Sequence, residues 1–156
     1  ALATGWFGLL PHRVFAAGIK IAWSDEEVRR MDSLAVQPAK LFATEEEARE
    51  RYLKVSGLAA VAGAPASVSA RGIAHGDGGW RLAMDPRANA VGKPPLSELM
   101  ALARCPVHLA RGGNDAMVTL EQTRSLDAEA RDLGPHGHNV MVEAPAQVWD
   151  WMASFS

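Results

Sequence analysis

Two short apolar runs, far apart in the chain, most limit the folds that this sequence can adopt. Residues 13–23 (RVFAAGIKIAW) are apolar almost throughout, and residues 105–111 (CPVHLAR) form a second run, bounded by Pro106 and Gly112. Continuous apolar runs of this kind are typical of strands that are buried on both faces of a parallel sheet. A weaker strand is expected over residues 128–133. The sequence therefore predicts a parallel sheet at the core of the molecule.

Helix-start signals lie between and after these runs. A Ser or Thr followed three residues later by Glu or Gln is the pattern of a capping box. This pattern begins three predicted helices, at Ser24–Glu27, Thr44–Glu47 and Thr119–Gln122. Two further helices are expected over residues 94–104 and 144–155. The resulting order is strand, long helical segment, strand, helix, strand, helix, which favours an α/β fold with a parallel sheet and flanking helices.

The long middle segment divides the chain into two predicted parts. Residues 1–23 and 101–156 carry the predicted strands and form the α/β core. Residues 24–100 carry no strand as strongly apolar as those two runs, and we interpret them as an inserted helical cap or lid.

Composition excludes several classes of function. The formal net charge of −2 over 156 residues provides no positive surface for nucleic acid or for an anionic membrane. The single cysteine, Cys105, permits no disulfide within the chain and no cysteine-based metal cluster. No apolar stretch has the length of a membrane span, and the apolar opening lacks the pattern of a signal peptide. We therefore expect a cytoplasmic protein.

Asp115 and His138 are the candidate catalytic residues. Each lies in a loop after a predicted strand, and the carboxyl ends of neighbouring parallel strands meet at one edge of a sheet. A carboxylate that orients a histidine is the orienting half of a nucleophilic triad. Two other interpretations remain open at this point. Asp115 after Gly-Gly-Asn is also a natural turn residue, and His136, His138 and Asp115 together would suit a zinc site.

The two loops resemble those of the α/β-hydrolase family. In that family the acid typically lies in a G-x-x-D-x-x-V pattern after the seventh strand, and residues 112–118 (GGNDAMV) match it with one additional glycine. The family histidine lies in a Gly-His loop after the eighth strand, here Gly137-His138, often followed by Glu-x-Pro, here residues 143–145. The resemblance implies the C-terminal half of this fold, with residues 13–23 as its sixth strand and the middle segment as its cap.

The nucleophile of the family is missing from the sequence. None of the serines lies in a G-x-S-x-G elbow; they are Ser24, Ser33, Ser56, Ser67, Ser69, Ser97, Ser125, Ser154 and Ser156. The resemblance places the elbow and the oxyanion hole upstream of Ala1, so this chain by itself is predicted to be an inactive fragment. An aspartate nucleophile, with dehalogenase or epoxide-hydrolase chemistry, is one alternative. A non-catalytic, truncated or degenerate hydrolase is the other.

The resemblance implies an esterase-like hydrolase. His138 would serve as general base, Asp115 as its orienting acid, and a small apolar ester as substrate, with neither a metal nor a cofactor. The predicted partners include no nucleic acid and no membrane. A sheet that begins at the sixth strand would expose an unpaired edge, which predicts self-association.

Overall fold

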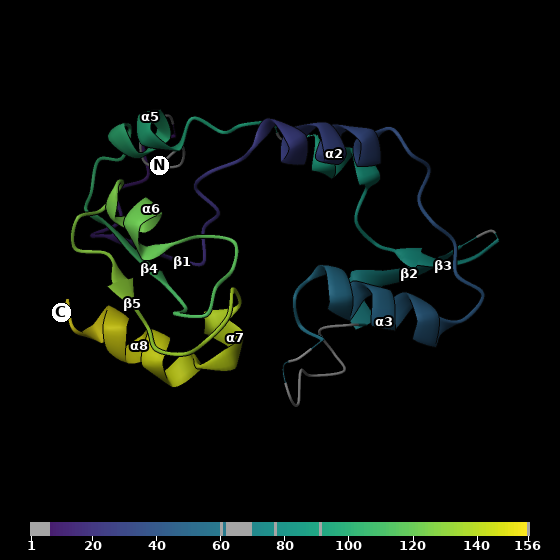
Figure 1. Cartoon of the computed structure of the whole chain (residues 1–156). Helices are drawn as coiled ribbons and strands as arrows, with labels where there is room; N and C mark the ends of the chain where they lie inside the picture. Colours follow the sequence, from purple (N-terminus) through teal and green to yellow (C-terminus); the bar gives the residue numbers. More distant parts are fainter. Residues whose placement is uncertain (1–6, 60, 62–69, 77, 91, 156) are drawn as a thin grey trace. The chain divides into compact units, whose positions relative to one another are not determined.

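The structure, a computed structural model, describes residues 7–59, 61, 70–76, 78–90 and 92–155 (Figure 1). The chain divides into two compact units. The first comprises Ala1–Trp23 together with Pro94–Ser156, and the second comprises Ser24–Lys93. The inserted segment was expected to end at residue 100, but the second unit ends at Lys93. The difference arises because α5 (Leu96–Ala101) belongs to the first unit.

A three-stranded sheet forms the centre of the first unit. Its order is β1–β4–β5, and both pairings are parallel. The strands are β1 (Val14–Ala17), β4 (Val107–Arg111) and β5 (Arg131–Asp132). The predicted α/β class with a parallel sheet is therefore confirmed. The strand expected over residues 13–23 is wrong in length, because Gly18 adopts a left-handed backbone (φ +69°) directly after β1 and the ladder ends there.

The central strand β4 is the most deeply buried strand of the sheet. Leu109 and Ala110 are each only 2% exposed. Because β5 is two residues long, it pairs only with Ala110 and Arg111 at the carboxyl end of β4. The Asp127 carboxylate accepts the Leu109 backbone N–H at 2.8 Å, so a side chain satisfies a donor that a longer β5 would have bonded.

Helices lie on both sides of this sheet. Helices α5 and α6 (Leu120–Arg124) lie on one side, and α7 (Val140–Glu143) and α8 (Pro145–Ala153) lie on the other (Figure 1). An aromatic cluster joins α8 to the strands. The Phe15 ring of β1 lies 5.3 Å from Trp151 and 5.6 Å from Phe155, and the His108 ring of β4 lies 3.9 Å from Phe155. Trp151 of α8 and Phe155, which follows the helix, thus pack on the sheet.

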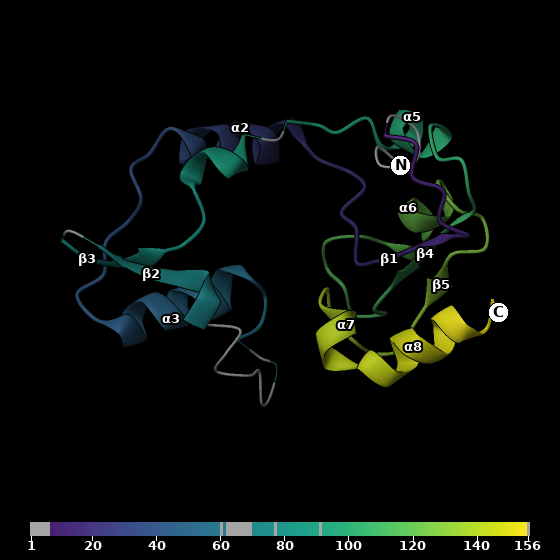
Figure 2. The same ribbon diagram turned by 180° about the vertical axis from the view of Figure 1, so that it is seen from behind.

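The second unit contains a β-hairpin that the sequence patterns did not predict. Its elements are α2 (Asp25–Ala35), α3 (Glu45–Val55), β2 (Ile73–Gly76), β3 (Gly79–Leu82) and the 3-10 helix η1 (Pro86–Asn89). Strands β2 and β3 pair in antiparallel register and lie against α3 (Figure 2). The insertion was expected to be mostly helical, and a paired hairpin within it was not expected. Strands of four residues with glycine at the turn have too short a pattern to be distinguished from a loop.

All three predicted capping boxes are present. The Ser24, Thr44 and Thr119 side chains each accept a hydrogen bond from the backbone N–H of the residue three positions later. The side chain of that later residue accepts a hydrogen bond from the backbone N–H of the cap residue.

Across the described residues, no helix has both the length and the apolar character that crossing a membrane requires.

Candidate active site

Asp115 lies in the loop that follows β4, and its carboxylate is fully buried. The Asp115 backbone N–H donates to the Gly112 carbonyl at 3.0 Å, which closes a turn. One carboxylate oxygen, Oδ1, accepts the Met117 N–H at 2.8 Å. The other oxygen, Oδ2, lies 2.9 Å from Nδ1 of His138. The residue is therefore both the turn former and the partner of the histidine.

His138 lies in the loop that follows β5, and its side chain is 33% exposed. An ionised carboxylate only accepts hydrogen bonds, so the contact with Asp115 requires the proton to be on Nδ1. In the neutral imidazole this leaves Nε2 unprotonated, as a basic nitrogen on a partly exposed ring. The structure thus brings together the two residues that the sequence singled out, although 23 positions separate them in the chain.

Direct backbone contacts join the two loops. The Gly113 N–H donates to the Gly134 carbonyl at 2.6 Å, and the Asn114 N–H donates to the His136 carbonyl at 2.9 Å. A Cβ at Gly112 would lie 2.2 Å from the same His136 oxygen, far inside contact distance. The first glycine of the Gly-Gly-Asn-Asp sequence is therefore required by the close approach of the histidine loop.

The residue after β1, Gly18, also lies close to the histidine loop. The Gly18 N–H donates to the Ala110 carbonyl at 3.1 Å. A Cβ at Gly18 would lie 2.4 Å from the His138 carbonyl oxygen. The sequence interpretation missed Gly18. A glycine inside an otherwise apolar run was the available signal.

The structure separates the residues of the alternative metal site. The His136 ring turns toward α8, where its Nε2 lies 2.9 Å from the Gln147 side-chain oxygen, whereas His138 pairs with Asp115. Across the described ranges, no cluster of three or more His, Cys, Asp or Glu side chains is arranged to hold a metal ion.

Sequence reasoning assigned no role to three charged residues that hold the loops; of these, Glu143 entered only as part of the Glu-x-Pro pattern. Glu143, the last residue of α7, accepts the Gly137 N–H at 2.7 Å through its carboxylate. Arg111 ends β4 as a buried cation, and its guanidinium pairs with Asp132 at 3.0 Å. A charged residue at the end of an apolar strand was the signal for Arg111, since such a group is rarely buried without partners.

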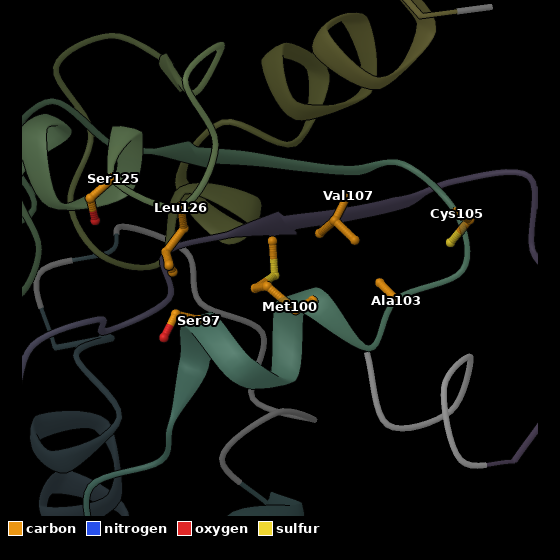
Figure 3. A pocket seen from close by; sticks show the side chains of 8 residues that line it. Ser97, Met100, Ala103, Cys105, Val107, Ser125 and Leu126 are labelled. Atoms are coloured by element: carbon orange, nitrogen blue, oxygen red, sulfur yellow. The ribbon is translucent and has the colours of Figure 1, made fainter.

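A pocket of about 400 Å³ lies at the other end of β4 (Figure 3). Its lining includes Met100 of α5, Cys105, Val107 at the start of β4, and Leu126. Asp115 and His138 follow the carboxyl ends of their strands and are absent from this lining. The pocket is therefore no part of the Asp115–His138 site.

Comparison with known proteins gives structural matches only. No model of a protein family matches this sequence, and no curated protein matches it. Among solved structures, E-2-(acetamidomethylene)succinate hydrolase matches with a TM-score of 0.70 and 17% identity, over 98% of this chain and 60% of that chain.

Two further structures have lower scores. A thioesterase domain from the curacin biosynthetic pathway matches with a TM-score of 0.59 and 14% identity, over 91% of this chain and 57% of that chain. An esterase from M. tuberculosis matches with a TM-score of 0.60 and 15% identity, over 84% of this chain and 48% of that chain. The chain therefore spans about half to three fifths of the length of these structures. At these identities the likeness shows the fold, which is the C-terminal part of an α/β-hydrolase.

Proposed function

Because the chain has the C-terminal part of the α/β-hydrolase fold, we propose that Asp115 and His138 are the acid and the base of a hydrolytic triad. One observation carries this proposal: Oδ2 of a fully buried Asp115 lies 2.9 Å from Nδ1 of His138, in loops that follow neighbouring parallel strands. This contact fixes the imidazole tautomer with Nε2 free to accept a proton, which is the arrangement that a nucleophilic triad needs.

The proposed mechanism assigns two proton transfers to each half of the reaction, one to His138 and one from it. His138 Nε2 takes the proton of a serine hydroxyl as the oxygen attacks an ester carbonyl. It then delivers that proton to the departing alcohol, and water releases the acyl group by the same sequence of transfers. Asp115 stays ionised and stabilises the imidazolium that forms. Its burial strengthens this interaction, because a low-dielectric surrounding screens the two charges weakly.

The nucleophile is assigned to a segment outside residues 1–156. Among the described serines, Ser24 caps α2 and Ser125 follows α6, where its hydroxyl donates to the Gln122 carbonyl at 2.7 Å. Ser67, Ser69 and Ser156 lie outside the described residues. The substrate class proposed is a small apolar ester. The unit Ser24–Lys93 is proposed as its cap, since it is inserted between β1 and α5.

The test uses the longest reading frame that contains residues 1–156, assayed with p-nitrophenyl acetate and butyrate. We expect His138→Gln to lower kcat/KM, and Asp115→Asn to lower kcat on the order of 10⁴-fold, because the amide cannot hold the required tautomer. His136→Gln is the matched control, since His136 lies in the same loop and points to Gln147. Equal activity of the His138 and His136 variants would remove His138 from the mechanism.

A second measurement distinguishes the type of nucleophile. A serine nucleophile predicts stoichiometric labelling by a phosphonate ester, blocked in His138→Gln. An aspartate nucleophile predicts turnover of haloalkanes or epoxides without that label. The absence of both activities and of labelling in the complete protein would support a non-catalytic hydrolase fold.

A further inference from the structure

A buried arginine lies beside the acid loop and donates to loop carbonyls and to Asp132. Arg111 is the last residue of β4, and its side chain is 9% exposed. A buried guanidinium is costly unless every donor is paired, so its partners show what the position requires. Its Nε donates to the Val118 carbonyl at 2.9 Å, and its Nη2 donates to the carbonyls of Gly113 at 3.0 Å and Asp115 at 2.9 Å.

These three carbonyls come from one loop. They span Gly113 to Val118, so the backbone of the acid loop curves around a single planar cation. The fork geometry of a guanidinium suits this task, because its donors point in fixed directions within one plane. These six residues form no helix or strand, so their carbonyls depend on partners outside regular secondary structure.

The same cation reaches the histidine loop through Asp132. The Arg111 Nη1 donates to Asp132 Oδ2 at 3.0 Å, and Asp132 Oδ1 accepts the Gly134 N–H at 3.0 Å. Gly134 in turn accepts the N–H of Gly113 through its carbonyl at 2.6 Å. These hydrogen bonds form a closed ring. It runs from Arg111 to Asp132, then to Gly134 and Gly113, and the Gly113 carbonyl accepts from Arg111.

We propose that Arg111, neutralised by Asp132, is a positioning residue that holds the acid loop and the histidine loop in register, so that the Asp115 carboxylate stays aimed at His138 Nδ1. This inference rests on the proposed role of Asp115 and His138. Arg111 acts through the loop backbone and touches neither the imidazole nor a substrate. Its effect is therefore expected on the geometry of the pair.

The tautomer of His138 reports this geometry directly. Long-range ¹H–¹⁵N correlations of the imidazole distinguish a ring protonated on Nδ1 from one protonated on Nε2, and the His138→Gln variant assigns the signal. At a pH where the ring is neutral, we expect wild-type protein to show the Nδ1–H form. Arg111→Met is expected to move the His138 signal toward a mixture of both tautomers. The His136 signal is expected to change less than the His138 signal.

Three further variants separate positioning from simple loss of packing or charge. Arg124→Met removes another arginine of the same unit, one whose Nε donates to the Ala130 carbonyl at 3.4 Å, and it should leave the His138 signal unchanged. Arg111→Lys keeps the charge and loses the fork, so it should shift the signal as Arg111→Met does. In Arg111→Met/Asp132→Asn the shift should not exceed that of Arg111→Met, since both residues belong to one network.

The outcomes separate this inference from the proposed function. A wild-type ring protonated on Nε2 would overturn the Asp115–His138 pair and the inference with it. A wild-type Nδ1–H form that persists in folded Arg111→Met would overturn the inference alone. Persistence in Arg111→Lys but not in Arg111→Met would show that charge suffices and would overturn the role of the fork.

Discussion

The two oxygens of the Asp115 carboxylate have different tasks. Oδ1 accepts the N–H of Met117 and closes a local turn, and Oδ2 faces the His138 ring. A side chain that bonds the backbone two residues later is a common turn device, and it also fixes the carboxylate plane. At the scale of a residue, a structural function and the proposed catalytic function are therefore not alternatives.

Gly112→Ala tests the contact between the two loops. The added Cβ would meet carbonyl oxygens of His136 and Gly137 at 2.2 and 2.3 Å, so the loops must separate. We expect a loss of about 1–3 kcal/mol in the free energy of unfolding, as for overpacked sites, measured by urea denaturation. Gly76→Ala is the control, because its Cβ would meet no atom within 4 Å. Equal stability of the two variants would contradict the close packing of the loops.

At the scale of elements, α2, α3, α6 and η1 begin with a side-chain cap, whereas α5, α7 and α8 do not. Asp85 caps the 3-10 helix η1, where its Oδ1 accepts the Arg87 N–H at 2.9 Å and its Oδ2 accepts from the Arg87 guanidinium at 2.7 Å. These bonds from the Arg87 side chain, and next from its backbone, lower the pKa of Asp85 from 3.8 to about 2. A lowered carboxyl pKa stabilises the folded form above pH 3.8, and this contribution is lost as the pH falls through about 2.

The Asp85 titration is a direct test of this cap. Carbon-detected NMR of the Asp85 carboxyl should give a pKa of about 2, and Arg87→Gln should raise it toward 3.8 because the side-chain bonds are lost. Arg81→Gln is the control, because Arg81 has a smaller effect on Asp85 than Arg87 has. An unchanged midpoint in Arg87→Gln would show that the ion pair does not persist in solution.

At the scale of the whole molecule, one edge of the sheet is open. Strand β1 pairs with β4 on one side, and no strand in the described part of the chain pairs with its other side. The N–H groups of Val14 and Gly18 donate to the β4 side, at 2.9 and 3.1 Å. Because donors alternate along a strand, those of Phe15 and Ala17 point to the open side, where a second copy of the chain can pair.

Self-association through this edge is predicted for the 156-residue chain. Light scattering after size exclusion should show a mass that rises with concentration. Amide exchange of Phe15 and Ala17 should slow in parallel, whereas the Val14 amide, already bonded to the Pro106 carbonyl, should change little. A concentration-independent monomer with one sharp unfolding transition would rule this association out.

Local patterns in the sequence were sufficient for the helix starts and for the fold class. The capping boxes at Ser24, Thr44 and Thr119 form as expected, because they depend only on residues within one turn. The apolar run of β4 is buried as expected, since its hydrophobicity requires a core. The hairpin β2–β3 and the early end of β1 were missed, because each depends on a glycine in a short segment whose pattern is ambiguous.

The sequence by itself determined that Asp115 and His138 each follow a predicted strand, since apolar runs and turn residues are local features. That these strands are parallel neighbours was an expectation that only the tertiary structure confirmed. Only the tertiary structure decided that the two side chains meet at 2.9 Å. It also decided that Arg111 binds the acid loop and that Gly18 and Gly112 leave room for the histidine loop. These contacts join segments distant in sequence. Their distances depend on packing between loops, for which the chain carries no periodic signal.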